Sequence, residues 1–141
     1  MARIKLEIPS VVHFSTDIQI RITDINYGGH MGNDALLSLI HEARVRFLRH
    51  YGYSELNVEG IGLMMNDVAI VYKAEAFYGE ILRFDISVVD FHRFGCDLFN
   101  RIINTASGKE VARAKTGIVF YNYIEKKLTG AFRKRNHTVQ Y

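Results

Sequence analysis

Apolar and polar side chains alternate along the first part of the chain. From Thr16 onward, Ile18, Ile20 and Ile22 are separated by single polar residues. This two-residue period is typical of a strand with one buried face. We therefore expect a first strand over about residues 16–22.

The next apolar pattern has the spacing of an amphipathic helix. Asn33 is a favourable N-cap residue, and Asp34 places a carboxylate at the positive end of the helix dipole. Gly52, after Tyr51, is a stop signal. We expect a helix of about 17 residues that begins near Asp34 and buries one broad face. That face consists of Leu36, Leu37, Leu39, Ile40, Ala43, Phe47 and Leu48.

Four further segments have strand character, and three short turn-rich connections separate them. These connections are too short to contain crossover helices, which favours antiparallel pairing and an α+β fold over βαβ repeats. The expected strands lie at about 68–72, 82–89, 98–103 and 111–121, and the turns at 78–80, 93–95 and 106–109.

A single helix on one face of such a sheet leaves strand edges uncovered, and pairing with a second copy protects them. We expect a homodimer or a homotetramer.

Composition agrees with one domain over residues 1–141. The hydrophobic fraction is 48% and the charged fraction 23%, which are ordinary values for globular proteins and exclude a disordered or disulfide-rich class. Neither a run of about 20 apolar residues nor a secretory signal is present. Cys96, the single cysteine, cannot form an internal disulfide and is expected to be a packed apolar residue. These features predict a cytoplasmic protein without a membrane span.

The net charge of +3 is unevenly distributed. Five basic residues crowd the C-terminal end: Lys126, Lys127, Arg133, Lys134 and Arg135. They could attract phosphates, or simply keep the terminus solvated. No recognition helix or aromatic-basic motif accompanies them, so we do not expect nucleic-acid binding.

A turn-rich loop at residues 24–33 precedes the predicted helix. The run Arg-Ile-Thr-Asp-Ile-Asn-Tyr-Gly-Gly-His-Met-Gly-Asn at 21–33, followed by Ile-His-Glu-Ala-Arg at 40–44, resembles the signature of hotdog-fold acyl-CoA thioesterases of the hydroxybenzoyl-CoA thioesterase-like family. Residues 72–80 are similar to a strand-turn segment of that family, and the resemblance covers about 16–122.

This resemblance implies a hotdog fold, in which a curved antiparallel sheet wraps around a long central helix. It also implies active sites at a dimer interface that accept acyl-CoA or acyl-carrier-protein thioesters, with no metal and no cofactor. The loop itself suits such chemistry, because unpaired N–H groups at a helix start can stabilise the negative charge that develops on a thioester oxygen.

The chain departs from the family pattern at one position. Aligned on His30, the first acidic position is Asp24, but the second is occupied by Asn26. In the family the second aspartate commonly acts as nucleophile or base. A neutral amide can orient water or a carbonyl but cannot replace a carboxylate as base.

Four residues are therefore catalytic candidates, and three of them have a structural alternative. His30 could act as base or donor, or could hold the loop backbone. Glu42 could be a helix-borne carboxylate, or could pair with Arg46 four residues on. Asp24 could be a base, or could cap the turn. Asn26 is expected to orient the water or the carbonyl.

The candidate substrate-binding residues come from the loop and from two distant segments. Glycines allow the substrate to approach the backbone closely, a partner subunit could present Asp67 to the cleft, and Arg93 could contact the phosphates of coenzyme A. The set is Tyr27, Gly28, Gly29, Met31, Asp67 and Arg93.

Three functions fit these features. The first is hydrolysis of an acyl-CoA or acyl-carrier-protein thioester. The second is a non-catalytic acyl-thioester binding protein, which Asn26 keeps open. The third is a hotdog hydratase or dehydratase, which is disfavoured because the histidine-proline-glycine neighbourhood of those enzymes is absent.

Overall fold

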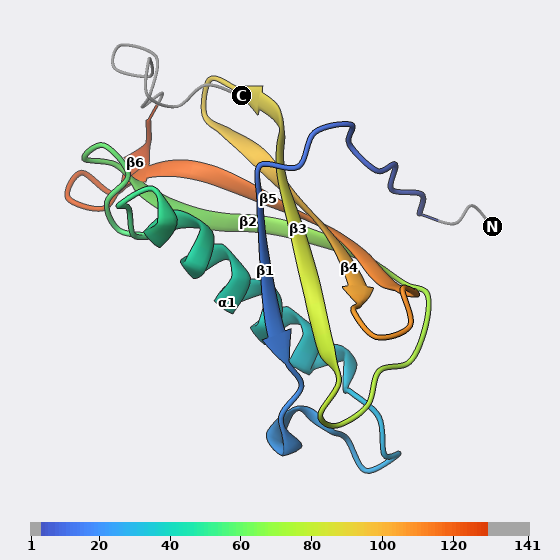
Figure 1. Cartoon of the computed structure of the whole chain (residues 1–141). Coiled ribbons are helices and arrows are strands. Elements are labelled where there is room, and N and C mark those ends of the chain that lie inside the picture. Colours follow the sequence, from blue (N-terminus) through green and yellow to red (C-terminus); the bar gives the residue numbers. More distant parts are fainter. Residues whose placement is uncertain (1–3, 130–141) are drawn as a thin grey trace.

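One long helix lies along a curved antiparallel sheet in the computed structural model, which describes residues 4–129 (Figure 1). The sheet order is β1-β3-β4-β5-β2, with the short β6 paired to β5. The elements are β1 (Phe14–Gln19), the 3-10 helix η1 (Ile22–Asp24), α1 (Asn33–His50), β2 (Gly62–Tyr72), β3 (Ile81–His92), β4 (Gly95–Asn104), β5 (Glu110–Asn122) and β6 (Lys127–Leu128).

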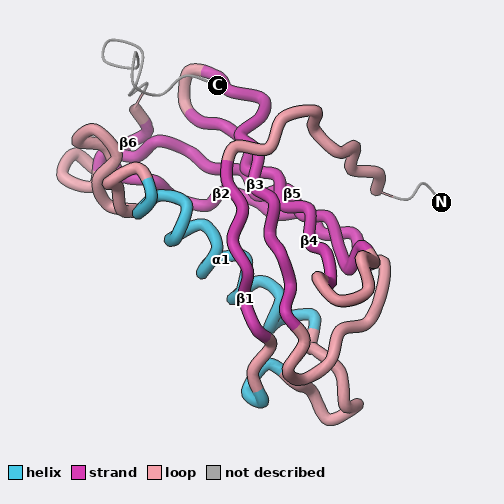
Figure 2. Tube along the Cα trace, viewed as in Figure 1, coloured by secondary structure: helices cyan, strands magenta, loops and turns pink. Residues whose placement is uncertain are grey.

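The strand order follows from the connections. β3, β4 and β5 are joined by short turns and pair as successive hairpins. In the sequence α1 lies between β1 and β2, and these two strands lie at opposite ends of the strand order (Figure 2). The predicted α+β class, with a long helix packed on a curved antiparallel sheet, is confirmed.

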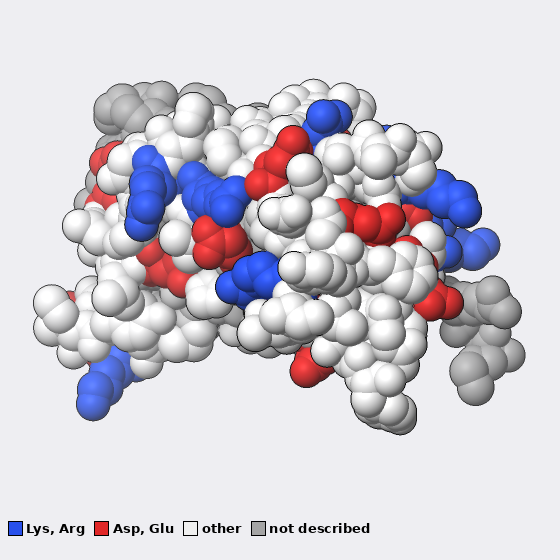
Figure 3. All heavy atoms as spheres, turned by 60° about the horizontal axis from the view of Figure 1, so that its bottom comes forward, with Lys and Arg blue, Asp and Glu red and all other residues white. Residues whose placement is uncertain are grey.

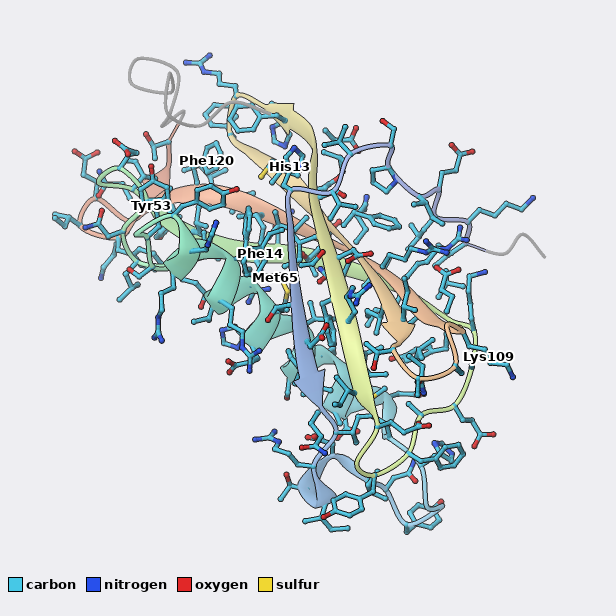
Figure 4. The ribbon with its side chains drawn as sticks, in the orientation of Figure 1. His13, Phe14, Tyr53, Met65, Lys109 and Phe120 are labelled. Carbon is cyan, nitrogen blue, oxygen red and sulfur yellow. The ribbon has the colours of Figure 1, made fainter. Side chains whose placement is uncertain are left out.

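The core lies between α1 and one face of the sheet. On β5, alternate residues from Ala112 to Phe120 are buried, as the two-residue period predicted. Leu36 of the helix and Phe84 of β3 are fully buried in the same cluster. The Phe14 ring, labelled in Figure 4, lies 5.7 Å from the Phe47 ring and joins the start of β1 to the helix.

The first strand differs from the expected one. It begins at Phe14 and ends at Gln19, so Ile22 is not part of it and is 67% exposed. The reason is local: the backbone N–H of Arg21 donates to the Asp24 carboxylate over 2.8 Å, which turns the chain into η1.

The helix boundaries also correct the expectation at one end. The N-cap is Gly32, with no side-chain cap, and Asn33 is the first helical residue. Leu37 is 38% exposed and lies outside the buried face. At the other end Gly52 has a positive φ of 81°, so the predicted stop is confirmed.

β2 is much longer than the predicted run at 68–72, because it begins at Gly62. Its first half lacks alternation and is mostly exposed, since β2 is an edge strand that pairs only with β5 among the described strands. No helix within residues 4–129 has the length and apolar character needed to cross a membrane.

The segment before β1 packs on the sheet face away from α1. Ser87 Oγ donates to the Val11 carbonyl (2.6 Å), and Arg113 Nη1 donates to the Leu6 carbonyl (2.8 Å). Cys96 is buried on the core side, as expected. Of the basic C-terminal residues, Arg133, Lys134 and Arg135 lie outside the described residues.

Candidate active site

Asn26 organises the loop before α1. Its side-chain Oδ1 accepts hydrogen bonds from the backbone N–H groups of Gly28 (2.9 Å) and His30 (3.4 Å). Its own N–H donates to the His30 carbonyl over 2.9 Å. This is the local pattern by which asparagine replaces backbone pairing in turns. The amide of Asn26 therefore shapes the loop that carries His30.

One nitrogen of the His30 ring is hydrogen-bonded within the loop, and the other is not. Nδ1 lies 3.1 Å from the Met31 carbonyl oxygen. Because a carbonyl oxygen only accepts, Nδ1 carries the hydrogen, and Nε2 keeps its lone pair in the neutral ring. The side chain is 35% exposed, so water can reach it. Nε2 of His30 is therefore available to take a proton.

A distant segment packs against this loop. The Met31 N–H donates to the Ala76 carbonyl over 2.7 Å, and Ile20 and Glu80 are joined by a backbone hydrogen bond of 2.9 Å. Residues 74–80 thus lie beside the loop at the lower end of Figure 1. This packing places a Glu75 carboxylate oxygen 3.9 Å from His30 Nε2.

The start of α1 leaves its first amides free. Gly32 N–H donates to the Asp24 carbonyl (3.0 Å), and Leu36 N–H makes the first helical bond, to Gly32 (3.3 Å). Among the described residues the intervening N–H groups, at 33–35, have no acceptor. Such groups form a positive site for an anion or a developing oxyanion.

Two side chains flank this helix start. The Tyr72 hydroxyl of β2 donates to the Asn33 carbonyl over 3.0 Å. Burial raises the pKa of Tyr72, and the charge of Asp34 raises it further, so the phenol stays protonated. Asp34 Oδ1 would lie 2.7 Å from a Cβ at position 32, which is why glycine fits there.

The carboxylate of Asp24 is hydrogen-bonded within the turn that follows β1. Asp24 is 4% exposed, and besides the Arg21 N–H its carboxylate accepts from Nη2 (3.1 Å) and Nε (3.3 Å) of the same residue. The hydrogen bond and the charge of Asp24 raise the pKa of Arg21. The arrangement favours the capping alternative for Asp24 over a role as base.

Glu42 lies on the exposed side of α1 and pairs with Arg46 over 2.9 Å. Arg46 also donates to Thr16 Oγ1 and to the Asp17 carbonyl, both at 2.9 Å. Glu42 lies nine positions after Asn33 in the helix, which is roughly 13 Å along the axis. Within one chain Glu42 is not brought to the loop, and its catalytic role stays a prediction.

The predicted substrate-binding residues divide into two groups. Tyr27, Gly28 and Gly29 form the exposed tip of the loop, and Tyr27 is fully exposed. Gly29 has a positive φ of 86°, a conformation that favours glycine. Met31 is 6% exposed and belongs to the core, so its buried side chain anchors the loop to the core.

Asp67 and Arg93 are not brought to the loop by this chain. Asp67 lies at a bulge in β2 and points over Gly117, on the sheet face away from α1. Arg93 lies in the turn after β3, with its guanidinium 5.1 Å from the Phe94 ring centre. The loop packs near the other end of β3, roughly 35 Å away along a strand of this length.

Sequence reasoning missed Glu75 and Asp34 as neighbours of the site. Asp34 was interpreted only as a dipole partner, although its place in the first turn is a signal for proximity to the loop. Nothing in the spacing of Glu75 pointed to His30, because their contact depends on the packing of two loops.

The surface at this end carries both signs of charge. Figure 3 shows basic and acidic side chains side by side, with uncharged areas between them. Within residues 4–129 no group of three or more His, Cys, Asp or Glu side chains is arranged to hold a metal ion.

A family model for the thioesterase-like superfamily matches residues 20–131. No curated protein matches the chain by sequence.

Similar solved structures include a 1,4-dihydroxy-2-naphthoyl-CoA thioesterase from Synechocystis, with 22% identity, TM-score 0.75, and coverage of 82% of this chain and 87% of that one. A DHNA-CoA thioesterase from Staphylococcus aureus has 20% identity, TM-score 0.77, and coverage of 89% and 85%. A gentisyl-coenzyme A thioesterase has 17% identity, TM-score 0.72, and coverage of 82% and 93%. These likenesses concern the fold, and the hotdog arrangement expected from the motif is confirmed.

Proposed function

Because the chain belongs to the thioesterase-like superfamily, we propose that it hydrolyses a thioester of coenzyme A to a free acid and a thiol. The observation that carries the proposal is the placement of His30 Nε2, open to water, in the loop that leads into the unpaired amides of α1. An acyl-carrier-protein thioester presents the same reacting group and is the alternative substrate.

The proposed reaction uses His30 as general base. Nε2 takes a proton from water while the water oxygen attacks the thioester carbonyl carbon. The carbonyl oxygen becomes an oxyanion that the amides at 33–35 stabilise. The intermediate then collapses, the C–S bond breaks, and the proton on Nε2 passes to the leaving thiolate. General bases contribute about 10² to 10⁴-fold, and a single oxyanion donor about 10² to 10³-fold.

Asn26 enters this proposal as a positioning residue. Its Oδ1 accepts from the His30 N–H and the Gly28 N–H, so it fixes the loop on which the base lies. An asparagine at this place cannot form an acyl intermediate through its neutral amide. The proposal therefore requires direct attack by water.

The working form is proposed to be a homodimer built through β2, or a homotetramer of such dimers. β2 is an 11-residue edge strand with exposed Met64, Met65 and Val68. A long apolar edge is a template for another strand. The Tyr72 contact to Asn33 ties this edge to the helix start, so a partner on β2 would lie close to the proposed site. A cytoplasmic location also remains a proposal, supported by the single buried Cys96.

The test is a panel of short, long, branched and aromatic acyl-CoAs, with release of free thiol followed over time. We expect turnover of at least one class, lost in His30→Ala while circular dichroism and thermal unfolding are retained. If no acyl-CoA is hydrolysed, the panel is repeated with acyl groups on a carrier protein. Absence of thiol release from both carriers would overturn the proposal.

A second function is a non-catalytic acyl-thioester binding protein. The observation that favours it is Asn26, whose amide shapes the loop and leaves no acidic group at that position. Calorimetry with a non-hydrolysable acyl-CoA analogue separates the two functions. Tight binding combined with no thiol release supports the second.

A further inference from the structure

We propose that Glu75 is the carboxylate partner of His30, a positioning residue that stabilises the imidazolium formed when Nε2 takes a proton. The inference rests on the proposed function and deepens it. Its basis is the 3.9 Å separation between Glu75 Oε2 and His30 Nε2. Glu75, from another part of the chain, supplies a negative charge that the neutral side chain of Asn26 does not provide.

The main chain sets this separation. Met31, next to His30, donates through its N–H to the carbonyl of Ala76, next to Glu75, over 2.7 Å. Ala76 is 1% exposed, so this contact is anchored in the core. The following turn is held by the Phe77 N–H, which donates to the Glu80 carboxylate over 2.7 Å. The two side chains therefore face each other because their backbones are joined.

The two ring nitrogens of His30 then have distinct roles. Nδ1 donates to the Met31 carbonyl and fixes the ring orientation. Nε2 faces Glu75 and remains open to water, since 3.9 Å is too long for a direct hydrogen bond. In the reaction the proton moves from water to Nε2, and Glu75 takes none. Its charge lowers the free energy of the protonated ring in the transition state.

Glu75 is better suited to this role than Asp24 and Glu42, the two carboxylates predicted from the sequence as catalytic candidates. Asp24 is occupied by Arg21 and Glu42 by Arg46. Within the described residues Glu75 has no lysine or arginine in ion-pair distance, and the His30 ring is the basic group beside it. Its negative charge is therefore not neutralised by a neighbouring cation.

The kinetic test compares Glu75→Gln with Glu7→Gln, a matched change at an exposed glutamate of the N-terminal segment. Unit charges about 4 Å apart in water interact strongly enough to change a rate about fivefold. We expect Glu75→Gln to lower kcat about fivefold with KM within twofold, Glu75→Asp to regain part of the loss, and Glu7→Gln to match the wild type. In a His30→Gln background, Glu75→Gln should have no further effect. An equal loss in that background would overturn the pairing.

A spectroscopic arm does not depend on turnover. The ¹⁵N resonances of the His30 ring should show hydrogen on Nδ1 in the neutral form. Glu75→Gln should shift the Nε2 resonance at constant pH, whereas Glu7→Gln should not. Unchanged Nε2 resonances in a folded Glu75→Gln protein would overturn the inference, even if the protein is a thioesterase. A shifted resonance in a protein without thioesterase activity would instead overturn the proposed function alone.

Discussion

The backbone N–H of Met31 donates to the carbonyl oxygen of Ala76 over 2.7 Å. This bond joins the loop before α1 to the segment before β3 without using any side chain of the candidate site. We therefore expect substitutions at Asn26, His30 or Glu75 to leave this main-chain connection in place, so that their effects on turnover can be measured apart from global unfolding.

Asn26→Ala should lower turnover at least tenfold, because the His30 N–H and the Gly28 N–H lose their acceptor. The lost hydrogen bonds should reduce the free energy of unfolding by about 1 kcal/mol. Asn26→Asp retains an acceptor and should keep turnover within threefold. Steady-state thiol release and urea unfolding measure both quantities. Wild-type turnover in Asn26→Ala would remove Asn26 from the mechanism.

Glu42→Gln tests the helix carboxylate. An exposed pair such as Glu42 with Arg46 is worth about 0.3–0.5 kcal/mol, so stability should hardly change. Because Glu42 is far from the loop within one chain, we expect turnover to stay within threefold. A much larger loss of turnover than of stability would instead support the catalytic role predicted from the sequence, with Glu42 acting in a site completed by a second copy.

Cys96 should be unreactive in the folded protein. Burial raises the pKa of its thiol to about 12, and the charge of Asp97 adds to the effect. At pH 8 roughly one thiol in ten thousand is then ionised. Labelling with a thiol reagent at pH 8 should be at least 100-fold slower in buffer than in denaturant. Rapid labelling of native protein would show that β4 opens readily.

Glu55 should make the free energy of unfolding decrease at acidic pH. Burial raises its pKa, but the hydrogen bonds from Arg44 (2.6 Å) and His41 (2.9 Å) outweigh burial, so the pKa lies below its usual 4.5. The stabilisation is therefore fully present above the unfolded value and is lost as pH falls through the lowered pKa.

Glu55→Gln should consequently reduce the free energy of unfolding by about 2 kcal/mol at pH 7 and by less at a pH low enough to protonate the carboxylate in the folded protein. Urea unfolding at the two pH values checks this difference. Equal losses at both would mean that packing of the loop, and not the carboxylate charge, is responsible.

Met65→Glu tests the proposed β2 interface. Met65, labelled in Figure 4, is 46% exposed on this edge strand. A charge there should oppose strand pairing between copies, and we expect sedimentation to shift from dimer toward monomer at micromolar concentration. Leu56→Glu, in the loop before β2 and 72% exposed, is the matched control. A dimer that survives Met65→Glu would place the interface elsewhere.

The parts of the fold that the sequence predicts well are those with a strong period. The alternation from Ala112 to Phe120 and the helical spacing from Leu36 to Leu48 both reflect burial on one face. The start of β2 at Gly62 was missed because an edge strand has no buried face over its first half. The first half of β2 is held in the sheet by its pairing with β5, and its own apolar and polar residues do not alternate in a way that would predict a strand.

The candidate site was predictable only in its loop. His30 and the helix start are adjacent in sequence, and the motif identified them together. Glu75 reaches His30 because two turns pack against each other, which no local pattern encodes. The N-cap was assigned to Asn33 on residue preference, whereas the helix begins one residue earlier, with Gly32 as an N-cap that has no side chain to cap with.

The Tyr72 hydroxyl, hydrogen-bonded to the Asn33 carbonyl, is a single phenolic strut between the outer strand and the first turn of α1. If two copies pair through β2 as proposed, this hydrogen bond connects the subunit interface to the helix start that is proposed to hold the oxyanion. Assembly and the geometry of the helix start are then expected to change together.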